Sequence, residues 1–66
     1  MENTNMKVLR AKENLTQEDM AKIIGCSTYS YIQKEKGRVD FSKQEMKNVK
    51  EEFDLTLAEF WTIFFE

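Results

Sequence analysis

Apolar residues recur three and four positions apart along most of the chain, which is the spacing of one face of an α-helix. The pattern predicts five short helices, at about residues 6–13, 17–24, 28–36, 43–53 and 57–65. No stretch alternates apolar and polar residues for long enough to favour a β-strand, so the sequence predicts an all-α fold. Four apolar residues between the helices are expected to reach into the core: Leu15, Cys26, Phe41 and Leu55.

Capping residues mark where the predicted helices begin, because their side chains can accept hydrogen bonds from the free N–H groups of a first turn. Ser42 and Thr56 are each followed three residues later by glutamate, which is the capping-box pattern. The other candidate caps are Thr16, which has Asp19 three residues later, Ser27 and Asn5. The only two glycines, Gly25 and Gly37, stand where the second and third helices are expected to end.

The composition of the 66-residue chain argues against several classes of function. With no histidine and one cysteine, Cys26, it cannot form an internal disulfide, and neither a zinc site nor nucleophilic catalysis assisted by histidine is expected. The paired carboxylates of Glu51 and Glu52 are more simply a solvated helix end, and so small a chain has little room for a substrate cleft. We therefore expect one domain over residues 1–66 that is not an enzyme and takes no metal, cofactor or small-molecule ligand.

The sequence carries no signal for a membrane or for export. No apolar run approaches the roughly 20 residues that a bilayer span requires. The first five residues lack the charged and then apolar pattern of a secretion signal. A single free thiol is typical of a reducing compartment, so the sequence predicts a cytoplasmic protein with no membrane partner.

Charge is distributed unevenly although the formal net charge is only −2. Residues 27–50 carry six basic and three acidic side chains, a balance of +3. Residues 51–66 carry five acidic side chains and no basic one, whereas residues 1–26 are balanced. The protein can therefore present a basic face even though its average is acidic.

One stretch of the chain combines particular residues with a particular register. It consists of Leu15-Thr16-Gln17-Glu18, Ala21, Gly25, Ser27, Glu35 and Gly37. This stretch resembles the helix-turn-helix of the Xre family, to which the phage Cro and C1 repressors belong, and the likeness continues through both flanks. It implies a compact five-helix, lambda-repressor-like DNA-binding domain with its helix-turn-helix at about residues 16–36. It also implies a short phage-type transcriptional regulator.

The helix after Ser27 is the candidate recognition helix. Rotation by about 100° per residue puts one set of its side chains outward: Thr28, Tyr29, Ile32, Gln33 and Lys36. Tyr31 and Glu35 fall on the inward side, together with Ser30 and Lys34. Gln33 can pair with N6 and N7 of adenine, and Thr28 can contact a base through its hydroxyl or methyl group. In the family, the positions that match Thr28, Tyr29 and Gln33 contact bases. Ile32 either touches thymine methyl groups beside them or indicates a helix rotated from this orientation.

Contacts with DNA phosphates are expected on both sides of that helix. The amide of Gln17, at the start of the preceding helix, can hold a phosphate oxygen, as the matching glutamine does in the family. The other candidates are Ser27, Lys36, Arg38 and Lys43, although for Lys43 a solvated charge is the simpler interpretation. The family also commonly pairs an arginine with a glutamate at the positions of Arg10 and Glu35, which implies a partly buried structural salt bridge.

The last predicted helix is more apolar than so small a core requires. Leu57, Phe60 and Phe64 share one face and are expected to be buried. Trp61 and Phe65, four residues apart, form either an exposed dimer surface or additional cover for the core. Lys34 falls on the inward face of the third helix, where its stem is expected to cover the core while its ammonium group reaches water.

These features lead to a main interpretation and an alternative. The main one is a sequence-specific regulator that binds a double-stranded DNA operator as a homodimer, acting as a repressor in the cytoplasm of a bacterial or phage-infected cell. The alternative is a protein-interaction module, an antirepressor or inhibitor, that uses the same fold to bind another regulator. The acidic tail and Trp61 favour the alternative, whereas Gln17, Gln33 and the basic middle segment favour DNA.

Overall fold

The computed structural model describes residues 3–65, in which the chain forms five α-helices and no strand. The helices are α1 (Thr4–Lys12), α2 (Gln17–Ile24), α3 (Thr28–Glu35), α4 (Lys43–Glu52) and α5 (Leu57–Phe65). Each predicted helix is found, with bounds that differ from the prediction by two residues at most. The all-α fold is therefore confirmed.

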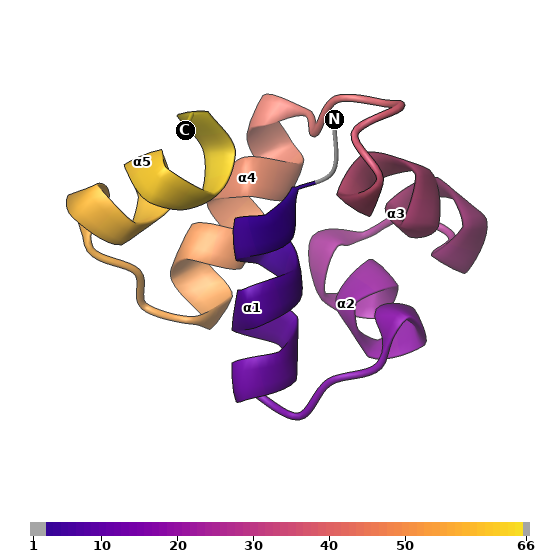
Figure 1. Ribbon diagram of the computed structural model, residues 1–66, viewed down its shortest axis with the longest axis horizontal. Coiled ribbons are helices and arrows are strands. Elements are labelled where there is room, and N and C mark those ends of the chain that lie inside the picture. Colours follow the sequence, from indigo (N-terminus) through magenta and orange to yellow (C-terminus); the bar gives the residue numbers. More distant parts are fainter. Residues whose placement is uncertain (1–2, 66) are drawn as a thin grey trace.

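The helices pack into one globule in which neighbours in sequence are not always neighbours in space. α2 packs against α3 and α4, whereas α1 packs against α3 and α5. Figure 1 shows α5 and α3 toward opposite ends of the long axis, with α1 running between them. The radius of gyration is 10.5 Å, close to the value of about 11 Å expected for a compact chain of this length.

The predicted capping residues are found at the start of every helix except the first. The side chains of Thr16, Ser42 and Thr56 each accept a hydrogen bond from the backbone N–H three residues later, and the carboxylate of that later residue accepts one from the backbone N–H of the cap. The prediction of Asn5 as a cap is wrong, because Oδ1 of Asn3 accepts from Met6 N at 2.9 Å and α1 begins earlier. Asn5 instead lies within α1 and donates from Nδ2 to the carbonyl of Thr62 in α5, at 2.9 Å.

Four helices are followed by a residue in the left-handed conformation, and only two of these residues are glycine. Gly25 (φ 87°) and Gly37 (φ 79°) follow α2 and α3 as predicted. Asn14 (φ 59°) follows α1 and Asp54 (φ 48°) follows α4. Asn and Asp are the non-glycine residues that most readily adopt this conformation, so the signal was present in the sequence.

The core corrects the predicted orientation of α5. Leu57, expected to be buried, is 77% exposed, and Ile63 is the buried residue of the helix. Phe60 and Phe64 are half-buried. The reason is that Asn3 and Asn5 bond the carbonyls of Ile63 and Thr62, which turns this side of α5 toward α1. The complete buried apolar set is Met6, Leu9, Met20, Ala21, Ile24, Tyr31, Phe41, Val49, Leu55 and Ile63.

The residues between helices follow the prediction in part. Phe41 and Leu55 are buried, whereas Leu15 and Cys26 are half-buried and pack against the core. Burial nevertheless raises the pKa of the Cys26 thiol. The longest helix in the described part of the chain has ten residues, well short of the roughly 20 that cross a bilayer. Between residues 3 and 65, metal-ligating side chains do not gather in groups of three or more.

Candidate nucleic-acid interface

A tight connection of three residues joins α2 to α3. Gly25 takes the left-handed conformation, and its N–H and that of Cys26 both donate to the carbonyl of Ala21, at 2.9 and 3.0 Å. A side chain at residue 25 would strain the backbone there. The carbonyl of Ile24 accepts from Nδ2 of Asn48 in α4 at 3.1 Å, so the connection is also tied to a third helix. The position of α3 on α2 is therefore closely constrained.

The two sides of α3 differ sharply in burial. Tyr31 and Glu35 on the inward side are 0% and 1% exposed, as the helical periodicity predicts. On the outward side Tyr29 is 73% exposed. Ser27, Lys36, Arg38 and Lys43 are exposed as well, whereas Thr28, Ile32 and Gln33 are half-buried. The outward side thus exposes the aromatic hydroxyl of Tyr29, and exposed hydroxyl and basic side chains precede and follow α3 along the chain.

The segment that follows α3 folds back on its last turn. The backbone N–H of Gly37 donates to the carbonyl of Lys34 at 3.0 Å, and that of Arg38 to the carbonyl of Gln33 at 2.9 Å. Nη1 of Arg38 lies 3.4 Å from Oε1 of Gln33, which brings a predicted base contact and a predicted phosphate contact together. Pairing of Gln33 with adenine uses both ends of its amide. The amide oxygen of Gln33 can accept two hydrogen bonds, so the bond from Arg38 leaves its second lone pair and both amide hydrogens for a partner.

A buried ion pair fixes the inward side of α3 to α1, and the predicted pairing of Arg10 with Glu35 is confirmed. Arg10 donates from Nε to Oε2 of Glu35 at 3.0 Å and from Nη2 to Oε1 at 3.3 Å. Its Nη1 donates to the carbonyl of Leu15 at 3.2 Å. Burial by itself would raise the pKa of Glu35, but the hydrogen bonds from Arg10 and Tyr31 outweigh it and hold that pKa below its usual value.

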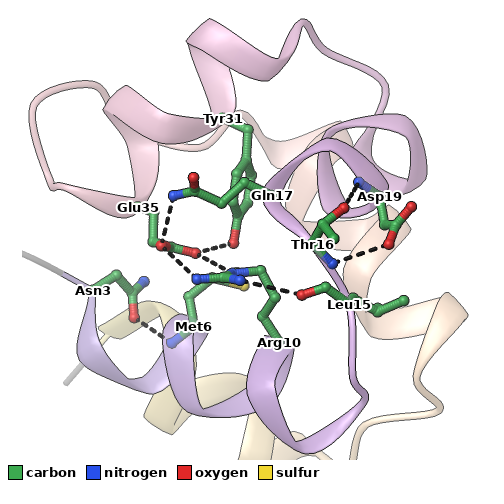
Figure 2. Close-up of polar contacts among 9 residues, drawn as sticks. All are labelled: Asn3, Met6, Arg10, Leu15, Thr16, Gln17, Asp19, Tyr31 and Glu35. Atoms are coloured by element: carbon green, nitrogen blue, oxygen red, sulfur yellow. Dashed lines mark hydrogen bonds and ion pairs between the residues drawn. The ribbon is translucent and has the colours of Figure 1, made fainter.

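Two further side chains, which the sequence analysis did not pair with Glu35, donate hydrogen bonds to its carboxylate. The hydroxyl of Tyr31 donates to Oε2, and Nε2 of Gln17 donates to Oε1 at 3.2 Å (Figure 2). The sequence does hold a signal for Tyr31, which lies four residues before Glu35 on the same face and needs a partner for its buried hydroxyl. For Gln17 no such signal exists, because its contact with Glu35 depends on how α2 packs against α3.

A second ion pair links α3 to α4 and corrects the expectation for Lys34. The ammonium group does not reach open water but pairs with Oε2 of Glu45, and the two side chains are 11% and 12% exposed. Glu45 also accepts from the backbone N–H of Ser42 at 2.8 Å. Burial by itself would raise the pKa of Glu45, but the hydrogen bonds from Lys34 and Ser42 lower it by more, so the net shift is downward. The ion pair crosses a loop, which is why local spacing did not predict it.

One side of α5 exposes three large apolar side chains. Leu57, Trp61 and Phe65 follow one another at intervals of four residues and are 77%, 59% and 53% exposed. The rings of Trp61 and Phe65 stack with centroids 5.0 Å apart. Of the two alternatives for this aromatic pair, the structure shows exposed side chains rather than cover for the core, and Leu57 extends the pair into a stripe along the helix.

Comparisons with known proteins found no relative of this chain. No protein-family model matches the chain, and searches of characterised proteins and of solved structures found no significant match. The resemblance to the Xre family thus stays a prediction that rests on the residues between Leu15 and Gly37.

Proposed function

We propose that the protein is a sequence-specific double-stranded DNA-binding transcriptional regulator in which α2 and α3 form a helix-turn-helix and α3 enters the major groove. The observation that carries the proposal is the contrast between the two sides of α3. Its inward side is tied to α1 and α4 by two ion pairs, while its outward side is left for a partner. A reading helix needs this combination, because base edges are discriminated only when the side chains are held in register.

The side chains around α3 support DNA as that partner. Gln33 and Thr28 have the groups that read base edges, and Tyr29 can contact a base or a phosphate with its hydroxyl. Lys36, Arg38 and Lys43 are exposed and can neutralise phosphates, and Ser27, exposed at the start of α3, can donate its hydroxyl to one. Gln17 lies at the start of α2, on the other side of the turn. Ile32 is half-buried and would meet thymine methyl groups. Occupation of an operator near a promoter would repress transcription by excluding the polymerase.

The experiment that tests the proposal is selection of bound DNA from a randomised duplex pool at near-physiological salt, with the folded state of the protein verified beforehand. Enrichment of a recurring motif is the expected result. On that site, Gln33→Ala should weaken binding by about 1–3 kcal/mol and relax the preference at one base pair. Gln44→Ala, which alters an exposed glutamine of α4, is the control and should leave the base preference unchanged. An equal loss on all sequences would contradict base reading by Gln33.

A phosphate contact has a different signature from a base contact. Lys36→Ala should weaken binding to every sequence and reduce the dependence of log K on log salt by about one unit. Lys12→Ala changes an equally exposed lysine at the end of α1 and serves as the matched control. An unchanged salt slope for Lys36→Ala would remove Lys36 from the phosphate contacts.

The stripe on α5 suggests a second copy of the chain as a further partner. Stacked and exposed aromatic side chains are unusual on a monomer, and a two-fold dimer would match a two-fold operator with half-sites about one helical turn apart. We therefore propose that Leu57, Trp61 and Phe65 form the dimer surface, at least on DNA. The same stripe favours the second candidate function, a module that binds another regulator. Failure of the folded protein to enrich any DNA would select that candidate.

A further inference from the structure

The carboxylate of Glu35 is the meeting point of four donor groups from three helices (Figure 2). Arg10 of α1 supplies Nε and Nη2, Gln17 of α2 supplies Nε2, and Tyr31 of α3 supplies its hydroxyl. Each carboxylate oxygen accepts two of these bonds, and the side chain is 1% exposed. Because hydrogen bonds are directional, the four donors together fix the rotation of the carboxylate.

The bond to Glu35 determines which way the amide of Gln17 faces. An ionised carboxylate only accepts hydrogen bonds, so the nitrogen of the amide and not its oxygen must point at Glu35. That nitrogen carries two hydrogens, and Glu35 takes one of them. A phosphate oxygen is likewise only an acceptor, so it can be held by the second hydrogen and by no other part of this side chain. One amide can therefore bind Glu35 and a phosphate at the same time.

Charge around this position is compatible with a phosphate. The negative charge of Glu35 would repel the ligand, but the guanidinium of Arg10 lies directly against it. The acidic residues in the first turn of α2 are also engaged, since Asp19 accepts from Thr16 N and Glu18 lies 3.9 Å from Nζ of Lys22. The Gln17 amide thus stands beside a compensated carboxylate rather than an open negative charge.

We propose that Tyr31 is a positioning residue for DNA binding, whose buried hydroxyl orients the Glu35 carboxylate so that Gln17 directs its second amide hydrogen to a phosphate. The inference rests on the proposed function and names a residue that does not touch DNA. Tyr31 is 0% exposed, so any effect of its hydroxyl on DNA affinity must pass through the groups that it contacts. One of these groups, Glu35, also bonds Gln17, a predicted DNA contact on another helix.

Tyr31→Phe isolates this role because it removes one oxygen and keeps the ring. The ring packs edge-on against Phe41, with centroids 6.5 Å apart, and that contact is retained in the variant. Arg10 and Gln17 still hold Glu35, but Oε2 loses one donor and the carboxylate gains freedom to rotate. Gln17→Met is the matched variant at the other end of the chain of contacts, since it keeps the length of the side chain and removes both N–H donors.

The test is a double-mutant cycle on a selected operator combined with methylphosphonate replacement of single phosphates. Tyr31→Phe should weaken binding by about three- to tenfold without changing the base preference. Gln17→Met should weaken it by about tenfold, and the double variant should bind like Gln17→Met alone. In the wild type, methylphosphonate at one particular phosphate should weaken binding. That sensitivity should fall in Tyr31→Phe and vanish in Gln17→Met, while the sensitivity at every other phosphate should be the same in the variants as in the wild type.

The outcomes separate this inference from the proposed function. A wild-type protein that is folded but enriches no DNA sequence would overturn the proposed function, and the inference with it. Two results obtained with specific binding intact would overturn the role of Tyr31 and leave the proposed function standing. One is additive effects of the two substitutions, and the other is a methylphosphonate profile that is the same in both variants as in the wild type. Loss of folding in Tyr31→Phe would show that the hydroxyl supports the fold rather than the contact, which also overturns it. Tyr31→Phe combined with Lys36→Ala is the control pair and should be additive.

Discussion

The two ends of the molecule, α3 and α5, are attached to the rest of the protein by different kinds of contact. α3 is held by directional polar bonds, in which Glu35 is paired with Arg10 and Lys34 with Glu45. α5 is held mainly by apolar packing, in which Ile63 is buried in the core and Phe64 lies 5.3 Å from Phe41 between ring centroids. Two asparagine bonds to its carbonyls complete the attachment.

The two kinds of contact restrict the orientation of a helix to different degrees. Apolar contact is non-directional, so a helix packed by rings can rotate slightly with small loss of energy. Charge-assisted hydrogen bonds restrict both distance and angle. The two ion pairs therefore constrain the orientation of α3, with Tyr29 facing outward, and such a constraint would suit the reading helix proposed above. The orientation of α5 is less restricted, and the docking of its apolar stripe on a partner would tolerate this because apolar contact is non-directional.

The largest expected effect comes from breaking the polar attachment of α3. Arg10→Ala should lower the free energy of unfolding by about 3 kcal/mol, because it leaves the buried charge of Glu35 with only neutral donors. Lys12→Ala, in the same last turn of α1, should change it by less than about 0.5 kcal/mol. Urea denaturation followed by circular dichroism measures both variants. Equal losses for the two would contradict a special role of the ion pair.

Breaking the aromatic attachment of α5 should cost somewhat less. Phe64→Ala should lower the free energy of unfolding by about 2 kcal/mol, less than a fully buried phenylalanine, because its side chain is half-buried. Phe65→Ala, on the exposed side of the same helix, should cost less than about 0.5 kcal/mol in the same urea experiment. A larger effect of Phe65 than of Phe64 would mean that α5 is rotated from the described orientation.

Acid should weaken the α3 attachment. The pKa values of Glu35 and Glu45 are lowered in the folded protein, so their contribution is present above the unfolded value of about 4.3 and is lost as the pH falls below it. The wild-type free energy of unfolding should therefore decline as the pH falls below about 4.3, until both carboxylates are protonated in the folded protein. Glu45→Gln should decline less steeply, whereas Phe64→Ala should run parallel to the wild type. A parallel curve for Glu45→Gln would show that its ion pair contributes nothing to this decline.

The smallest effect on stability is expected on the exposed stripe of α5. Trp61→Ala should change the free energy of unfolding by less than about 0.5 kcal/mol, because the side chain is 59% exposed. Self-association on DNA should fall in the same variant, as measured by sedimentation of the complex with a two-fold site. A loss of folding would instead place Trp61 among the residues that stabilise the core, and unchanged association would move the dimer surface elsewhere.

Much of the site could be predicted because helical periodicity and capping are local. Thr16, Ser42 and Thr56 begin their helices as expected, and the inward placement of Tyr31 and Glu35 follows from a rotation of about 100° per residue. Such signals span three or four residues, so they survive without any knowledge of how the helices pack. The pairing of Arg10 with Glu35 came from the family resemblance and not from spacing.

The sequence by itself determined that this chain forms five short helices, where most of them start and stop, and which side of α3 is buried. Only the tertiary structure decided that Gln17 and Tyr31 share the carboxylate of Glu35, and that Lys34 finds Glu45. It also decided that α5 turns Ile63 inward and leaves Leu57 exposed. The physical reason is that partners on different helices depend on how those helices pack. In addition, a helix that is apolar on nearly every side, such as α5, carries no polar face to indicate its orientation.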